Sequence, residues 1–150
     1  MNEYFASSSD VFRVLGALQE GVDLMPTADG AEKTVEASRM RLARMIGLEV
    51  DEAPAWQWEA LASWFAEALT RTITDAVFLR LSRGDVPRGA PVVTAGIGAD
   101  LLAEVARRLG RKSVDFCEAI EAPPEAGCCA PAVAVALLAA ADESHEAPLL

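Results

Sequence analysis

The sequence is short of positive charge and has no apolar run as long as a membrane span. It holds 13 lysines and arginines against 23 acidic residues, a net charge of −10. Proteins neutralise nucleic-acid phosphates with a basic face, so this balance argues against nucleic acid as a partner. The longest apolar run, Cys128 to Ala141, is shorter than the roughly 20 residues that span a bilayer. We therefore expect neither nucleic-acid binding nor a membrane span.

Histidine and cysteine are also scarce, which excludes several kinds of catalytic site. The single histidine, His145, lies in a polar tail, Asp142–Leu150, that we expect to be flexible, so a Ser/His or Cys/His nucleophile is not predicted. Adjacent cysteines, Cys128 and Cys129, cannot easily both bind one tetrahedral zinc ion, so no metal site is predicted. Three cysteines without framework spacing, and a start that does not resemble a signal peptide, lead us to expect a cytoplasmic protein. No catalytic residue is predicted.

Apolar residues, by contrast, are plentiful: they make up 52% of the 150 positions. The length and this composition predict a single domain over residues 1–141. Within it we expect a helical part over 7–84, a strand–turn–helix–strand part over 91–116 and a C-terminal helix over 131–141. Because the helix Ala132–Ala141 is apolar all round, its pattern predicts complete burial. The helical part should contain helices over Asp10–Leu18, Val35–Ile46 and Pro54 to about Arg83.

The strand–turn–helix–strand part is the one stretch built like a ligand-binding turn. Val92–Ala95 is β-branched and apolar, as is typical of a buried strand. A glycine turn follows, the period then becomes helical from Ala99, and Gly110 stands where a helix commonly ends. Ser113–Phe116 is the second candidate strand. A right-handed crossover would make the two strands parallel.

The candidate nucleoside-binding residues of this turn are Gly96, Ile97, Gly98 and Asp100. The dinucleotide fingerprint requires glycine or alanine at position 101, where this chain has Leu101. Asp100 would repel a phosphate placed on the start of the helix, so a ribose hydroxyl or an adenine edge fits the turn better. The alternative is a tight strand-to-helix turn that binds no ligand.

A second group of candidates lies in and after the loop Val22–Lys33. Thr27 and Asp29 would suit a metal or a substrate hydroxyl, and alternatively serve only the turn that ends at Gly30. Arg41 and Arg44 share a helix face, and with Lys33 they would suit an anionic substrate group. The alternative for these cations is a solvated face with acidic neighbours.

Seven stretches of the chain resemble, in this order, the C-terminal part of one known family. They are Glu3–Ala6 (EYFA), Asp10–Gly16 (DVFRVLG), Pro26–Gly30 (PTADG), Ser38–Met45 (SRMRLARM), Trp64–Ala68 (WFAEA), the turn from Val93 to Gly98, and Cys129–Ala136 (CAPAVAVA). The family comprises the hydantoinase/oxoprolinase-like proteins of the tetrahydromethanopterin-linked C1 transfer pathway. These are related to the synthase that couples an aminomethylfuran unit to a glutamyl-tyramine in methanofuran assembly. The resemblance covers nearly the whole chain but less than half of a family member.

The resemblance implies an α/β, mainly helical fold, the C-terminal lobe of an actin-like ATPase, with a short parallel strand pair. By this resemblance, Gly96-Ile97-Gly98 corresponds to a glycine turn that contacts the nucleoside in that superfamily. The first phosphate turn and the acidic residues around it belong to an N-terminal half that nothing in this sequence matches. The chain would then be a fragment or the partner of a separately encoded half.

The chain is therefore expected to be part of a transferase or synthase that makes the furan-containing cofactor, and to be inactive alone. ATP or another adenine nucleotide, with Mg²⁺, would be held with the complementary half. The isolated chain is expected to carry no cofactor, to act on a small-molecule substrate when assembled, and to need that half or a homo-oligomer. The competing hypothesis is a non-catalytic helical interaction or scaffold subunit.

Overall fold

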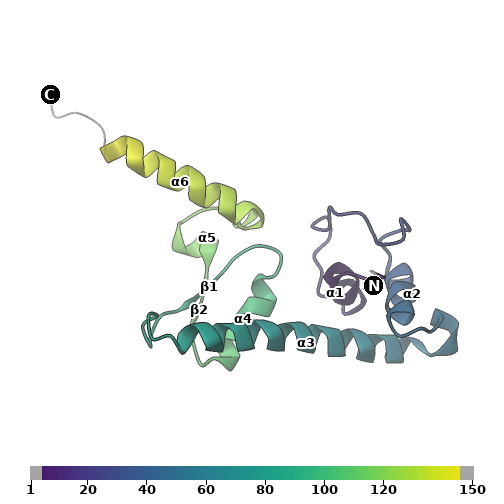
Figure 1. Ribbon diagram of the computed structural model, residues 1–150. Coiled ribbons are helices and arrows are strands. Elements are labelled where there is room, and N and C mark those ends of the chain that lie inside the picture. The colour runs from purple at the N-terminus through teal and green to yellow at the C-terminus, as the bar shows by residue number, and fades with distance from the viewer. Residues whose placement is uncertain (1–4, 146–150) are drawn as a thin grey trace. The chain divides into compact units, whose positions relative to one another are not determined.

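The computed structural model describes residues 5–145, and the side chains as far as residue 141. The chain is α/β and mainly helical, and its described part contains one sheet, made of two parallel strands (Figure 1). It divides into two compact units, Met1–Ala76 and Val77–Leu150, here called the first and the second unit.

Two short helices of the first unit begin at side-chain caps. Helix α1, Ser8–Val14, begins two residues before the expected Asp10, because Ser7 and Asp10 form a reciprocal capping box. Helix α2, Val35–Met45, is capped by Thr34, whose side chain accepts a hydrogen bond from the backbone nitrogen of Ala37 (3.1 Å). These caps satisfy backbone donors that a helix start otherwise leaves unpaired.

The core of the first unit joins α1 and α2 to the start of the long helix α3, Ala55–Leu81. Val11, Val14, Leu42 and Ala62 form its buried apolar cluster. Trp58 is buried beside the short 3₁₀ turn η1, Val50–Glu52, and its indole nitrogen donates to the carbonyl oxygens of residues 50 and 53. The predicted helix after Pro54 is thus confirmed, although α3 crosses from the first unit into the second at Ala76.

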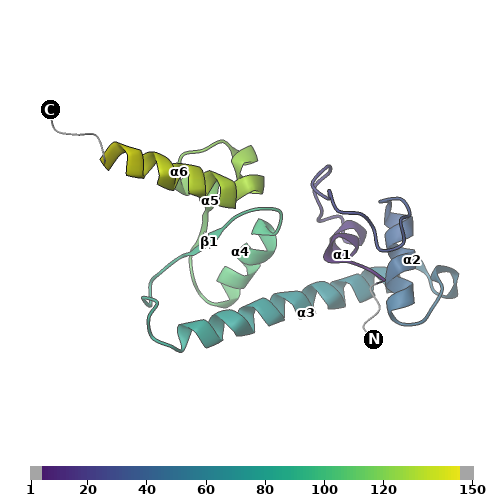
Figure 2. The ribbon, with the colours of Figure 1, turned by 45° about the horizontal axis from the view of Figure 1, so that its top comes forward.

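The second unit contains the predicted strand–turn–helix–strand segment. Strand β1, Val92–Thr94, leads through the glycine turn into helix α4, Ala99–Arg108 (Figure 2). Strand β2, Ser113–Asp115, returns parallel to β1. The register pairs Val92 with Ser113 and Thr94 with Asp115. Gly110 ends the helix with a φ of +64°, a conformation that glycine adopts without strain.

Three further elements follow, and they correct the expectations for this end of the chain. Helix α5, Phe116–Ala119, takes in Phe116, which was expected in the strand, because Asp115 caps the helix instead. The 3₁₀ segment η2, Pro124–Cys129, then leads into α6, Ala130–His145. The helix therefore continues into the tail expected to be flexible from residue 142, and residues 146–150 lie outside the described part.

Burial of the C-terminal helix is the clearest wrong prediction. Val135 and Leu138 of α6 are 67% and 68% exposed, and α6 packs against η2. An all-apolar helix indicates that some surface should cover it. The sequence pattern alone cannot tell whether that surface belongs to the same chain.

Candidate functional site

The first candidate site lies at the carboxyl edge of the parallel strand pair. There β1 ends and the chain turns through Gly96, whose φ is +75°, before α4 begins. The backbone nitrogen of Ala99 donates to the carbonyl oxygen of Gly96 (3.1 Å), which closes the turn. Gly98, the residue before the helix, has an ordinary φ of −89°. Gly96 is therefore the glycine that the backbone requires, and Gly98 is required only if something must approach closely.

Two other segments of the second unit meet this turn. The carboxylate of Asp115, at the end of β2, accepts hydrogen bonds from the backbone nitrogens of Cys117 (2.8 Å) and Glu118 (3.2 Å) and so caps α5. The carbonyl oxygen of Gly127, in η2, lies 3.8 Å from where a Cβ on Gly96 would stand. The turn, the start of α5 and η2 thus form one edge, where ligands of open parallel sheets usually bind.

Sequence reasoning found the turn but missed these neighbours. Asp115 was within reach of prediction, because the carboxyl ends of parallel strands share an edge and Asp115 ends the second predicted strand. Gly127 gives no such signal, since no helix or strand pattern is recognisable in the sequence around it. Its proximity to Gly96 depends on the path of the chain after α5.

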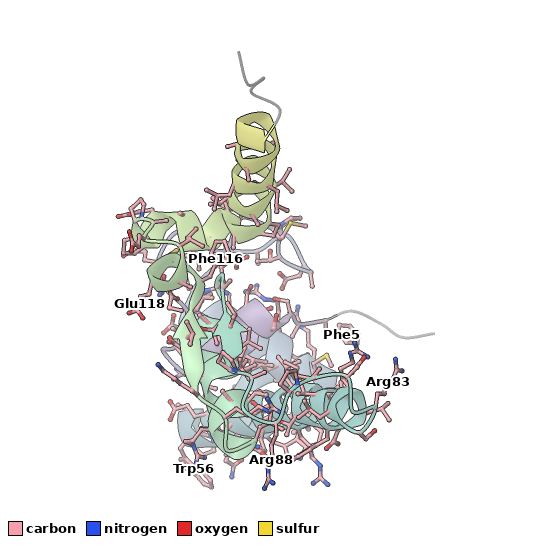
Figure 3. The ribbon with its side chains drawn as sticks, turned by 90° about the vertical axis from the view of Figure 1, so that its left-hand side faces the viewer. Phe5, Trp56, Arg83, Arg88, Phe116 and Glu118 are labelled. Atoms are coloured by element: carbon pink, nitrogen blue, oxygen red, sulfur yellow. The ribbon has the colours of Figure 1, made fainter. Side chains whose placement is uncertain are left out.

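The electrostatics of this edge disfavour a phosphate. Asp100 and Glu118 are both exposed there, and Figure 3 shows Glu118 on the outside of α5. The pKa of the Cys117 thiol is raised by burial, and further by the neighbouring Asp115 carboxylate. Ile97 is 56% exposed and supplies an apolar side chain. An exposed turn with backbone groups, one apolar residue and negative surroundings suits a neutral polar ligand better than an anion.

The second candidate site is a row of alternating charges in the first unit, here called the charge row. Its members are linked by ion pairs in the order Lys33, Asp23, Arg13, Asp10, Arg41, Asp29 and Arg44. At its centre Arg41 is completely buried and Asp10 is 2% exposed. The two ends are open to solvent, because the side chains of Lys33 and Arg44 are 38% and 39% exposed.

Asp10 and Arg41 satisfy each other with several hydrogen bonds. Arg41 Nε lies 2.8 Å from Asp10 Oδ1, and Ser38 Oγ donates to the same oxygen at 2.8 Å. Burial alone would raise the pKa of Asp10, but these bonds and that from the Ser7 backbone nitrogen outweigh it and lower the pKa below 3.8. The pKa of Arg41 is raised in turn: burial opposes the charge, but the Asp10 carboxylate favours it more strongly.

The structure brings together three of the substrate-binding candidates, Asp29, Arg41 and Arg44, but it joins them to one another, whereas Lys33 pairs with Asp23. Asp29 accepts from Nη1 of Arg41 (3.0 Å) and Nη1 of Arg44 (3.1 Å). Thr27 Oγ1 donates to the carbonyl oxygen of Ala31 (2.8 Å) and so serves its own loop. An anionic substrate would have to compete with two carboxylates for Arg41. Arg41 is also not on a solvated face, so the alternative interpretation of these cations fails for this residue.

Among the described residues, no group of three or more His, Cys, Asp or Glu side chains is arranged to hold a metal ion.

No family model matches the chain, and no curated protein matches it either.

Proposed function

We propose that the sheet edge of the second unit contacts the nucleoside of an adenine nucleotide. The observation that carries the proposal is the turn itself: Gly96 is left-handed two residues after the end of a parallel strand, and helix α4 begins three residues later. This is the geometry in which open α/β sheets receive ligands. The exposed carboxylate of Asp100 favours contact with ribose or adenine over contact with phosphate.

The resemblance in sequence extends this proposal to an enzyme. The chain would be the C-terminal, nucleoside-contacting lobe of a hydantoinase/oxoprolinase-like enzyme with an actin-like fold. That enzyme would act in making the furan-containing cofactor of tetrahydromethanopterin-linked C1 metabolism. Its phosphate- and Mg²⁺-binding groups would lie on a complementary half. By itself the chain should neither hydrolyse ATP nor catalyse the condensation.

This division of labour makes a specific prediction about ligand preference. Because the chain would supply nucleoside contacts only, phosphates should add nothing to its affinity, and the Asp100 carboxylate should weaken it. Adenosine should therefore bind the isolated chain at least as tightly as ATP. Asp100→Asn should narrow the difference between the two affinities by raising the affinity for ATP.

Hydrogen exchange of the full chain with adenosine or ATP tests the proposal. Adenosine should protect the backbone amides of residues 95–98. Gly98→Val should remove that protection, because the added side chain would occupy the space through which the ligand approaches the turn. Gly89→Val is the matched control, since neither glycine has a positive φ or a heavy atom within 4 Å of an added Cβ. Protection that survives Gly98→Val, or wild type protected by neither ligand, would overturn the proposal.

A second candidate function, a non-catalytic interaction subunit, is favoured by the exposure of α6. It predicts that no nucleoside protects the turn, whereas the loss of α6 side chains abolishes association with a partner. The two candidates therefore differ in the exchange experiment.

A further inference from the structure

Helix α6 is the largest apolar feature that the nucleoside proposal leaves unexplained. Val135, Leu137 and Leu138 are 67%, 48% and 68% exposed. At 100° per residue, Val135 and Leu138 lie about 60° apart and Leu137 lies about 160° from Val135, so the three side chains cover nearly half of the circumference of the helix. Figure 3 shows short side chains standing out from α6 on several sides. One flat surface would cover only part of them, whereas a groove would enclose the helix.

The charges around α6 indicate what kind of surface fits it. Residues 126–141 carry no charge, and no lysine or arginine follows Lys112 anywhere in the sequence. The flanking residues that do carry charge are acidic: Glu118, Glu121 and Glu125 are exposed before the helix, and Asp142 and Glu143 follow its apolar part in sequence. A complementary surface therefore has an apolar centre bordered by lysine or arginine.

This charge pattern decides between the classes of occupant. A second copy of α6 would bring acidic ends to acidic ends, whether the two helices ran parallel or antiparallel. A membrane fits poorly, although by length and composition alone Pro124–Ala141 is able to cross one. The uncharged residues 126–141 would span about 24 Å as a helix, against about 30 Å of hydrocarbon. Because the charges that flank the segment in sequence are acidic, it is also repelled by anionic lipid.

We infer that α6 docks into an apolar groove of a different protein, and that this groove is bordered by basic residues. The inference goes beyond the nucleoside proposal, because it concerns another surface and holds whether or not the turn binds adenosine. The exposed thiols of Cys128 and Cys129, directly before α6, provide a native reporter of the docked state.

Two labelled model peptides can act as probes of this partner chemistry: an amphipathic leucine/lysine helix and its leucine/glutamate counterpart. Fluorescence anisotropy at low salt should show binding of the full chain to the lysine peptide only. Leu137→Gln/Leu138→Gln should weaken it about tenfold or more, because each buried leucine contributes strongly to affinity. Leu79→Gln, at a leucine 66% exposed on α3, is the matched control and should bind as wild type does.

Several outcomes would overturn the inference. Equal binding by the double variant would show that the net charge of −10 attracts the peptide without α6. Binding of phosphatidylglycerol vesicles that is lost in the double variant would indicate a membrane. A dimer in sedimentation velocity that is lost in the same variant would indicate a second copy. Circular dichroism checks that the variant keeps its helices, and in wild type the lysine peptide should slow alkylation of Cys128 and Cys129 independently of any variant.

Discussion

The two units of the chain break the usual rules of burial in opposite ways. In the first unit, the charged side chains of Asp10 and Arg41 are 2% and 0% exposed. In the second, Val135 and Leu138 are more than two-thirds exposed. Buried charge and exposed apolar surface are the informative exceptions in a folded protein. The buried charges have partners within the first unit, whereas these apolar side chains of α6 are not covered by the second unit.

Each unit also carries its own spectroscopic or chemical reporter, so the comparison can be tested in the full chain. All three tryptophans, at positions 56, 58 and 64, lie in the first unit, and Trp58 is buried. Cys117, in the second unit, is 4% exposed, whereas the other two thiols are exposed. Tryptophan fluorescence therefore reports the unfolding of the first unit, and the alkylation rate of the buried Cys117 thiol reports that of the second.

The largest effect is expected from Asp10→Ala. It leaves the buried Arg41 guanidinium without its closest partner, which typically costs about 3–5 kcal/mol. The urea midpoint measured by tryptophan fluorescence should fall accordingly, while the protection of Cys117 changes much less. Asp75→Ala is the control, because the Asp75 side chain is 69% exposed and its pairing with Arg71 is long, at 3.9 Å. Equal losses for both variants would show that the charge row does not stabilise the first unit.

Acid should produce the next largest effect, again in the first unit. The folded-state pKa values of Asp10 and Asp29 are both lowered from 3.8. Their ionisation therefore contributes stability that is complete above about pH 4 and is lost as the pH falls through the folded-state values. Urea unfolding followed by tryptophan fluorescence should show stability falling with pH below 4. The slope should be smaller in Asp10→Asn, and an unchanged slope would contradict the assignment.

The same contrast explains which features were predictable from the sequence. The strand, the turn, α4 and the second strand are encoded within about 25 consecutive residues, so local patterns were sufficient. The shared helix face of Arg41 and Arg44 was predictable from their spacing, but the pairing of both with Asp29 was not, because Asp29 was considered only with Thr27 in its own loop. Asp10 was read only as a residue near a helix start. Its pairing with Arg41, 31 positions away, depends on how α1 packs on α2.

The prediction that α6 is buried was wrong for a different reason. An all-apolar helix was taken to lie in the core of its own chain, but hydrophobicity specifies only that cover is favourable. The source of the cover is a tertiary or quaternary fact that local sequence does not encode. The proximity of Gly127 to Gly96 could not be predicted either, because it depends on the tertiary path of the chain after α5 rather than on a local sequence pattern.

A smaller effect, now in the second unit, is expected from Gly96→Ala. An added Cβ would meet the carbonyl oxygen of Gly127 at an ordinary 3.8 Å, so the cost comes from the φ of +75°. An L-residue there is strained by about 1–2 kcal/mol. Cys117 should become correspondingly more reactive, with the tryptophan-detected midpoint unchanged. Gly98→Ala, with an ordinary φ and open space, should leave both reporters unchanged, and equal effects of the two variants would refute the special role of Gly96.

The smallest effect is expected from Glu104→Gln on α4, although the pKa of Glu104 is lowered to about 2. Hydrogen bonds from Arg107 and Arg108 cause this shift, at 2.6 Å and 2.8 Å for the closest atoms. A lowered pKa means stability that is present above 4.5 and lost as the pH falls through about 2. However, Glu104 is 34% exposed and Arg107 is 73% exposed, so water and salt screen the pairs.

Glu104→Gln should therefore shift neither the unfolding midpoint at pH 7 nor the reactivity of Cys117 by a measurable amount, and 1 M NaCl should not change this result. Asp10 and Glu104 then make a direct test of the comparison, because both carboxylates have lowered pKa values and only Asp10 is buried. Because the exposed pairs of Glu104 are screened, Glu104→Gln should leave the acid-induced loss of stability unchanged, whereas Asp10→Asn should reduce it. A loss for Glu104→Gln as large as that for Asp10→Ala would show that ion pairing, rather than burial, distinguishes the two units.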